Sequence, residues 1–302
     1  MNDNKTPVRN NISGVLVVDK PTGMTSHQVV QIIRNGSKIK RAGHTGTLDP
    51  RASGVLVVLV GPAVRLSEYI SADDKRYQAT IRLGGKTDTY DAEGEVTNTS
   101  DKTISLDEFE EALKGFVGEI EQVPPPYSAV KVNGKRAYKM ARKGEKVELE
   151  PRLINVYSLE LVEWNPPEAV VDVHCSSGTY IRSLAYDLGE ILGCGAYLNG
   201  LRRTKSGSFT LKSAISLRKL SEAFLNNDWY QYLIPAAEAL ADWPSITLSN
   251  EEVDAVRHGH RISREEGTEK MVQAITEQSE LVALMVYDQE KKEFQPKKVF
   301  FS

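Results

Sequence analysis

A loop that holds one carboxylate among glycines and threonines is the first place in the chain where chemistry is expected. Residues 43–50 read GHTGTLDP, and Asp49 is their only acidic side chain. Glycine lets a ligand come close to the backbone, and the proline after Asp49 biases that residue toward an extended or turn conformation. The segment matches neither the dinucleotide-binding glycine pattern nor a phosphate-binding loop with Gly-Lys-Ser/Thr. Asp49 is therefore a candidate site residue, although the loop taken alone favours the alternative of an ordinary Asp-Pro turn.

Two further residues are candidates for a functional site. Tyr77 stands at the start of a predicted strand, where core packing is the alternative to a role in a site. Arg182 falls in the first turn of a predicted helix, residues 179–192. The helix dipole disfavours a cation there by about 0.3–1 kcal/mol. A buried carboxylate partner would offset that cost. A solvent-exposed arginine is the alternative.

Basic side chains gather at a few places in a chain whose net charge is only −3. Residues 131–146 carry seven Lys or Arg and the single acid Glu145. Residues 201–207 (LRRTKSG) are interpreted as a basic turn before a strand. A locally basic surface on a nearly neutral protein favours selective binding to a phosphate backbone, although each cluster alone could be a solvated face.

Composition excludes several classes of protein. With 302 residues, 40% of them apolar and 26% charged, the chain can form a sizeable core. Two cysteines, Cys175 and Cys194, exclude a disulfide scaffold, and no histidine cluster with a third ligand suggests a metal site. The longest apolar run, residues 55–60, is too short for a membrane span, and the polar N-terminus lacks a signal peptide. We expect a soluble, cytoplasmic protein without metal or membrane attachment.

The elements that must position these residues follow from hydrophobic patterning. Strands and helices alternate without a regular βαβ rhythm, which favours an α+β fold with a mixed, largely antiparallel central sheet and flanking helices. Trp243-Pro244 is the predicted boundary between a body, residues 1–244, and a small β-barrel module, residues 245–302. Strands are predicted at 14–19, 54–60, 77–83, 95–97, 128–132, 153–162 and 169–175, and in the module at 245–248, 281–287 and 297–301. Helices are predicted at 26–35 with Ser26 as N-cap, near 106–116, and at 179–192, 216–225, 230–240 and 251–258.

Six segments follow one another along the chain in this order: GVLVVDKPTGMTSH, RAGHTGTLDPRASGVL, KRYQATIRLGGKTDTYDAEG, PPPYSAVKVNGKRAY, HCSSGTYIRSLAYDLG and LRRTKSG. Together they resemble the TruB family, the bacterial tRNA pseudouridine(55) synthases. The resemblance covers residues 14–210, and residues 245–302 are similar to the PUA-type RNA-binding barrels of this family. It implies the pseudouridine synthase fold with an RNA-binding insertion around residues 124–150.

The resemblance implies an activity and roles for individual residues. Uridine in the T arm of tRNA would be flipped out of the RNA and isomerised to pseudouridine, with Asp49 either attacking the nucleotide or stabilising charge on the sugar. Arg182 would pair with Asp49 and keep its carboxylate ionised in a closed pocket. Tyr77 would stack on the uracil, with a looser role in removing the C5 proton. His44 would fill the space that the base leaves. The other expected substrate or RNA contacts are Tyr180 and Leu201 lining the pocket, Lys20 and Pro21 packing beneath it, and Arg202, Arg203, Lys131, Lys135 and Arg136 on the backbone.

Nothing in this reaction requires an oxidant or an imported group, so no cofactor is expected. The partner is tRNA, no obligate protein partner is implied, and a monomer is expected. Three alternatives remain open. A non-catalytic RNA-binding or tRNA-folding protein would use the same basic clusters but does not explain Asp49. A glycoside hydrolase would need a second carboxylate near Asp49. A related synthase that works in a guide-RNA particle is disfavoured by the compact length and the absence of basic tails.

Overall fold

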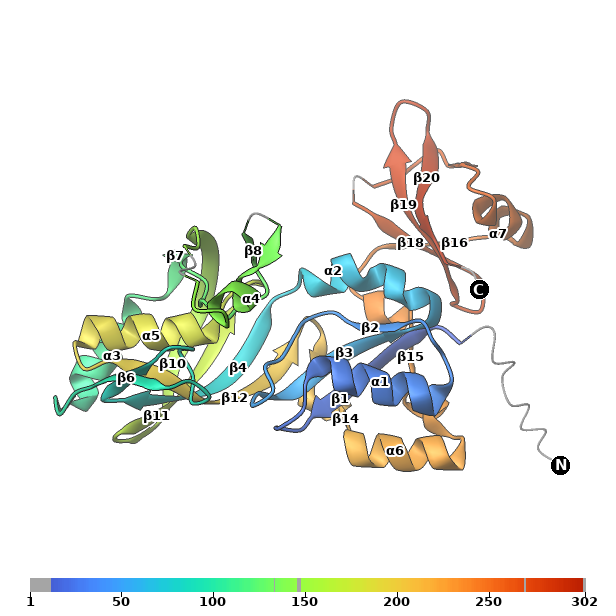
Figure 1. The fold of residues 1–302 in the computed structure, drawn as a ribbon. Helices are drawn as coiled ribbons and strands as arrows, with labels where there is room; N and C mark the ends of the chain where they lie inside the picture. The colour runs from blue at the N-terminus through green and yellow to red at the C-terminus, as the bar shows by residue number, and fades with distance from the viewer. Residues whose placement is uncertain (1–11, 133, 146–147, 269, 301–302) are drawn as a thin grey trace.

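A computed structural model describes residues 12–132, 134–145, 148–268 and 270–300. The chain forms a long central sheet and a smaller sheet near the C-terminus (Figure 1). Eleven strands make up the central sheet, and eight of them follow one another in the order β14-β1-β3-β12-β4-β11-β10-β7. Among the described strand pairs of the central sheet, only β1–β14 and β3–β12 are parallel, so the predicted α+β class with a mixed, largely antiparallel sheet is confirmed.

The strands of the central sheet are β1 (Gly14–Lys20), β2 (Ala42–His44), β3 (Ser53–Val60), β4 (Lys75–Leu83), β7 (Gly118–Gln122), β10 (Arg152–Asn165), β11 (Glu168–Cys175), β12 (Ala196–Ser206), β13 (Phe209–Thr210), β14 (Ile215–Ser216) and β15 (Ile234–Pro235). Two hairpins lie outside it, β5 (Gly85–Thr87) with β6 (Val96–Thr99), and β8 (Lys131–Val132) with β9 (Lys135–Arg136). The helices are α1 (Ser26–Ser37), α2 (Ser67–Ser71), α3 (Leu106–Lys114), α4 (Ala137–Ala141), α5 (Ile181–Leu192), α6 (Leu217–Asn226) and α7 (Asn250–Arg257).

Both faces of the central strands are covered, which explains their unbroken apolar sequences. Along β1, Leu16 and Val18 face the core that includes α1, α3, α5 and α6. Val15 and Val17 face the opposite core, to which α2 and the C-terminal part of the chain contribute. Successive residues of a strand point to opposite faces, so a strand buried on both sides has no polar alternation.

The structure corrects several predicted elements. Residues 201–207 do not form a turn, since Leu201 to Ser206 are the end of the long strand β12. The predicted helix at 230–240 is instead two short 3₁₀ turns, Trp229–Tyr232 and Glu238–Leu240, separated by β15. Thr25 rather than Ser26 caps α1, with Gln28 completing a capping box. The hydroxyl of Ser26 is used elsewhere, as described below.

The C-terminal sheet is a curled five-stranded sheet in the order β16-β18-β19-β20-β17. Its strands are β16 (Ser245–Thr247), β17 (Ile262–Ser263), β18 (Val272–Ile275), β19 (Leu281–Asp288) and β20 (Glu293–Val299), and α7 packs against it. The last predicted strand therefore begins earlier than residue 297, and Phe301 lies outside the described residues. None of the helices formed by the described residues has the length and apolar character needed to cross a bilayer.

Candidate active site

The loop between β2 and β3 that carries Asp49 is anchored on both sides of that residue. The buried hydroxyl of Ser26 accepts from the Leu48 amide at 2.9 Å and donates to the Leu48 carbonyl at 3.0 Å. After Asp49, the Pro50 carbonyl accepts from the Gly23 amide at 2.8 Å and from the Lys20 ammonium at 3.2 Å. The Ala52 amide closes a turn onto the Asp49 carbonyl at 3.0 Å. Hydrogen bonds therefore fix the backbone of this loop on both sides of Asp49, although the loop has no regular secondary structure.

Arg182 meets Asp49 as the sequence predicts. Its Nε lies 3.1 Å from Oδ2 of Asp49, and the Arg182 side chain is only 9% exposed while that of Asp49 is 40% exposed. Arg182 lies in the first turn of α5, whose N-cap Tyr180 offers no side-chain cap. Gln122 instead accepts from the Tyr180 amide at 2.8 Å and donates to the Tyr180 carbonyl at 3.0 Å, which fixes the start of the helix. The carboxylate is therefore held by a buried cation and can still be reached from solvent.

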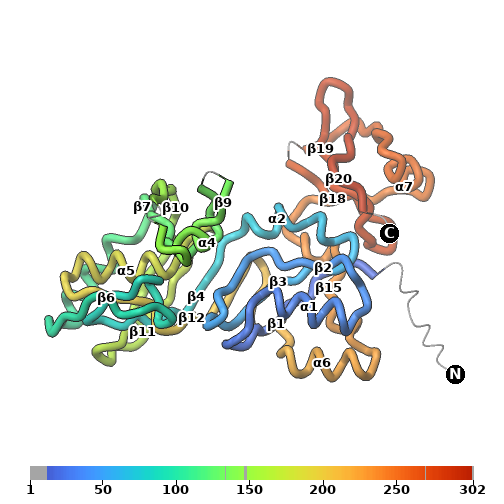
Figure 2. The backbone as a smooth tube through the Cα atoms, viewed as in Figure 1, coloured from blue at the N-terminus to red at the C-terminus, as the bar shows by residue number. Residues whose placement is uncertain are grey.

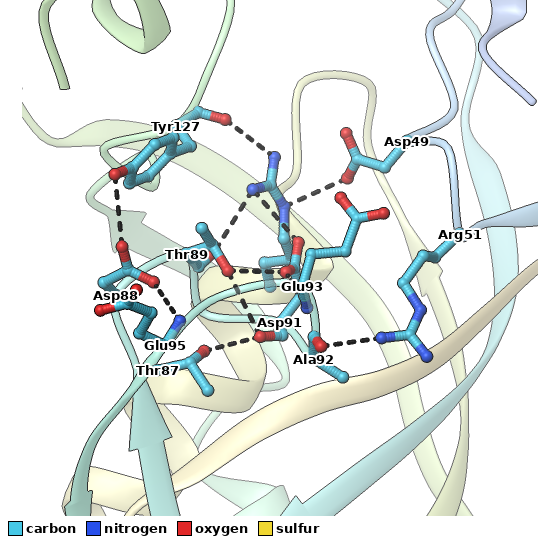
Figure 3. Close-up of polar contacts among 11 residues, drawn as sticks. Asp49, Arg51, Thr87, Asp88, Thr89, Asp91, Ala92, Glu93, Glu95 and Tyr127 are labelled. Atoms are coloured by element: carbon cyan, nitrogen blue, oxygen red, sulfur yellow. Dashed lines mark hydrogen bonds and ion pairs between the residues drawn. The ribbon is translucent and has the colours of Figure 1, made fainter. Parts of the chain in front are cut away.

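A second carboxylate that the sequence did not single out holds the other side of this guanidinium. Nη1 of Arg182 lies 3.5 Å from Oδ2 of Asp91 and donates to the Thr89 carbonyl at 3.3 Å. Nη2 donates to the Tyr127 carbonyl at 3.1 Å. Figure 3 shows Asp49 on one side of this network, with Tyr127, Thr89 and Asp91 on the other. The guanidinium is thus engaged from several directions, which fixes its orientation.

Both carboxylate oxygens of Asp91 have partners within the protein. Its Oδ1 accepts from the Thr89 hydroxyl at 2.6 Å and from the Glu93 amide at 3.0 Å. The same loop is joined to the Asp49 loop by Arg51, whose Nη1 donates to the Ala92 carbonyl at 2.8 Å (Figure 3). The segment KTDTYDAEG contains Asp91, but nothing in its spacing indicated a contact with Arg182. With both oxygens occupied, Asp91 does not supply the second catalytic carboxylate of a glycoside hydrolase.

Tyr77 lies on β4, in register with Val173 of β11 on one side and Arg203 of β12 on the other. Its side chain is almost buried. Burial raises the pKa of the Tyr77 phenol, and the positive charge of Arg203 acts in the opposite direction. The ring therefore sits beneath the site as a neutral phenol at neutral pH.

His44 and Lys20 border the same region. Burial lowers the pKa of His44, with further lowering by Arg203 and His27, so the imidazole is neutral at pH 7. Lys20 is fully buried at the end of β1, and its ammonium donates to the carbonyls of Pro21 at 2.9 Å and Met24 at 2.5 Å besides Pro50. Burial lowers the pKa of Lys20 to about 8, while nearby Asp49 favours its charged form.

Comparison with known proteins decides the family. Residues 34–181 match the TruB family pseudouridylate synthase (N terminal domain), and residues 182–241 match the tRNA pseudouridylate synthase B C-terminal domain. A tRNA pseudouridine synthase B from Pseudomonas aeruginosa is 44% identical over 258 residues, covering 84% of this chain and 85% of the relative. One from Symbiobacterium thermophilum is 48% identical over 252 residues, 82% of each chain. The chain belongs to the TruB family.

Solved structures show the same fold. One described as a Cbf5–Nop10–Gar1 complex contains a chain 30% identical to this one, with a TM-score of 0.73 over 95% of this chain and 85% of that chain. Another, an H/ACA RNP bound to a substrate RNA containing 2′-deoxyuridine, gives 29% identity and a TM-score of 0.72 over 96% of this chain and 85% of that chain. The TruB chain therefore has the pseudouridine synthase fold, and its curled C-terminal sheet fits a PUA-like domain, as predicted.

The remaining predicted RNA contacts occupy different surroundings in this TruB chain. Tyr180 and Leu201 are partly buried, and Pro21 is exposed beside Lys20. Arg202 is partly exposed and pairs with Asp19 at 2.9 Å. The hairpin residues Lys131, Lys135 and Arg136 are exposed. The hairpin begins a few residues after Tyr127, whose carbonyl accepts from Arg182, so it starts close to the Arg182 network.

Arg203 corrects one prediction. We expected it to meet a phosphate from a solvent-facing turn, but the residue is only 2% exposed. Its Nε donates to the Val55 carbonyl at 2.7 Å, and Nη2 donates to the Gly46 carbonyl at 3.1 Å. The pair Arg202–Arg203 lies on a strand, where neighbours point to opposite faces, so only one of the two arginines can face solvent.

Within the described residues, no three His, Cys, Asp or Glu side chains are grouped so as to hold a metal ion.

Proposed function

We propose that this TruB enzyme isomerises uridine 55 in the T arm of tRNA and that Asp49 is its essential carboxylate. As a tRNA pseudouridine synthase, the chain breaks the N1–C1′ bond of uridine and joins C5 to C1′, so that no atom is gained or lost. The observation that carries the proposal is the ion pair between the reachable carboxylate of Asp49 and the buried guanidinium of Arg182. A charged carboxylate fixed at an open position is what attack at, or charge stabilisation beside, an anomeric carbon requires.

The other residues take roles that their placement supports. Tyr77, a neutral phenol beside the site, stacks on the uracil, and its raised pKa disfavours phenolate as a proton acceptor. His44, kept neutral, fills the space left by the flipped base without adding a charge. The exposed basic residues Lys131, Lys135 and Arg136 contact the RNA backbone.

We extend the proposal to the organisation and setting of the protein. Residues 1–244 form the catalytic domain, with an RNA-binding insertion around residues 124–150, and residues 245–302 form an accessory RNA-binding domain. The enzyme acts as a monomer on tRNA in the cytoplasm, where its substrate is found, and needs neither a protein partner nor a cofactor.

The position of the modified nucleotide is tested with two tRNA transcripts. One carries uridine at position 55 and the other cytidine, and both keep every other uridine. After incubation with the enzyme, nucleoside chromatography and mapping of the modified position should reveal one pseudouridine, at position 55, and none in the cytidine transcript. Pseudouridine at another position, or equal yields from both transcripts, would refute the T-arm assignment.

A further inference from the structure

Arg203 is a buried cation with no acidic partner. In the described ranges of the chain, its guanidinium donates to two backbone carbonyls, those of Val55 and Gly46, and no carboxylate forms an ion pair with it. Removing a cation from water is costly unless an anion or several acceptors compensate it. An apolar side chain would fill the same space without that cost. A purely structural role therefore does not explain why the charge lies here.

Arg203 lies where the segments that carry the reacting groups meet. On β12 it is the register partner of Gly54 of β3 and of Tyr77 of β4. A Cβ added at Gly54, which has φ +100, would lie 2.2 Å from the Arg203 carbonyl oxygen, so β3 and β12 meet backbone to backbone here. The bond to the Gly46 carbonyl reaches into the loop that carries Asp49, three residues before it.

We propose that Arg203 is a positioning residue for the isomerisation, which fixes the Asp49 loop against β3 and opposite Tyr77. This inference rests on the proposed function. The planar guanidinium donates in two directions, from Nε to Val55 and from Nη2 to Gly46, and so locks the loop to the strand that follows it. A lysine ammonium, a single point charge on a flexible stem, cannot keep both bonds with the same geometry.

The charge of Arg203 also acts on the other groups of the site. It lowers the pKa of His44, second to burial, and lowers that of Lys20, after burial and the opposing effect of Asp49. The groups that bear on His44 are Arg203 and His27, both of which disfavour its protonation. A substitution that removes the charge should therefore be visible at His44, although the two residues lie on different strands.

The test compares Arg203→Met, Arg203→Lys and, as a matched control, Arg82→Met. Arg82 lies on β4 and pairs with Glu168 at 3.3 Å, away from the site. Single-turnover tritium release from C5-tritiated tRNA gives the rate, filter binding gives tRNA affinity, and NMR titration gives the pKa of His44. Because displacement of a reacting group by about 1 Å costs on the order of 100-fold in rate, we expect about that loss for Arg203→Met and roughly 10-fold for Arg203→Lys.

The expected pattern separates positioning from packing. Affinity should stay within a few-fold of wild type in all variants, and Arg82→Met should keep the wild-type rate. The pKa of His44 should rise in Arg203→Met and stay low in Arg203→Lys. A wild-type rate for Arg203→Met would overturn the inference.

If Arg203→Met does not fold, Arg203→Lys decides, because a wild-type rate in that variant shows that the two-directional bonding is not needed. Absence of tritium release by the wild-type protein would instead count against the proposed function, and the His44 titration would still test where the charge acts.

Discussion

At the scale of single residues, two buried cations, Arg182 and Lys20, hold the segment around Asp49, while the Asp49 carboxylate stays accessible to solvent. Arg182 holds Oδ2 of Asp49, and Lys20 donates to the carbonyl of Pro50, the next residue. Three carbonyls share the Lys20 ammonium, which compensates part of the cost of burying it. We therefore expect the free energy of unfolding to depend on the protonation of Lys20.

This protonation makes the stability of the protein depend on pH. Burial lowers the pKa of Lys20 to about 8 from 10.5, so between these values the unfolded chain binds more protons than the folded one. Stability contributed by this group then rises with pH across the window. One pKa unit corresponds to about 1.4 kcal/mol, so the complete rise is on the order of 3 kcal/mol.

Urea unfolding of wild type and Lys20→Met at several pH values from 7.5 to 10.5 (roughly the window set by the two pKa values) measures this contribution. The difference in unfolding free energy between the two proteins should shift in favour of wild type as the pH rises. A pH-independent difference would show that the amine of Lys20 titrates normally in the folded protein.

At the scale of elements, the loop between β5 and β6 determines how Arg182 is presented. Tyr90, next to Asp91, has φ +64, an unfavourable backbone conformation for a tyrosine. Its ring stacks on Tyr186 of α5 with centroids 3.9 Å apart and planes 18° from parallel. The Leu198 amide donates to the Tyr90 carbonyl at 3.0 Å, which ties the loop to β12. The stack thus joins the loop that carries Asp91 to the helix that carries Arg182.

Removing one ring should loosen that connection. Tyr186→Ala is expected to lower stability by about 1 kcal/mol through the lost stacking, and to slow single-turnover isomerisation several-fold because Asp91 no longer holds Arg182 firmly. Tyr186→Phe keeps the ring and serves as the control, with stability and rate near wild type. Thermal unfolding and tritium release measure the two effects. If the alanine variant matches the phenylalanine variant in both, the stack does not support the site.

The sequence predicts elements well where local pattern decides them and poorly where distant strands do. The apolar runs of β1 and β3 and the periodicity of α5 are visible locally, and the awkward position of Arg182 correctly indicated an acidic partner. Asp91 and Arg203 carry no such local sign. Whether a charged residue on β12 is buried depends on its register with β3 and β4, which pairs residues far apart in sequence.

At the scale of the whole molecule, the long strands β4 and β12 run through both halves of the central sheet (Figure 2). Register shifts in β12, between Leu198 and Gly200 and between Arg203 and Lys205, lie on either side of the segment that faces the site. Such bulges bend a strand and redirect its side chains. The Asp49 loop, the Asp91 loop and α5 meet along this bent stretch, so the site brings together segments that are far apart in the sequence.

The C-terminal sheet is docked onto this body by apolar and polar contacts. Leu284 and Phe300 belong to the same buried cluster as Val15 and Val57. Nη1 of Arg65 donates to the Val299 carbonyl at 2.6 Å, and Lys298 pairs with Glu68. Because the two sheets share core residues, they pack together as one unit.

The most direct test of the central claim is single-turnover tritium release by Asp49→Asn on C5-tritiated tRNA. The amide keeps the size of the side chain but not its charge, so tRNA affinity should remain while release falls on the order of 10⁴-fold or more. Asp172→Asn, which removes a surface partner of Arg76, is the matched control and should act like wild type. Release by Asp49→Asn at a rate near that of the control would contradict the assignment of Asp49 as the essential carboxylate.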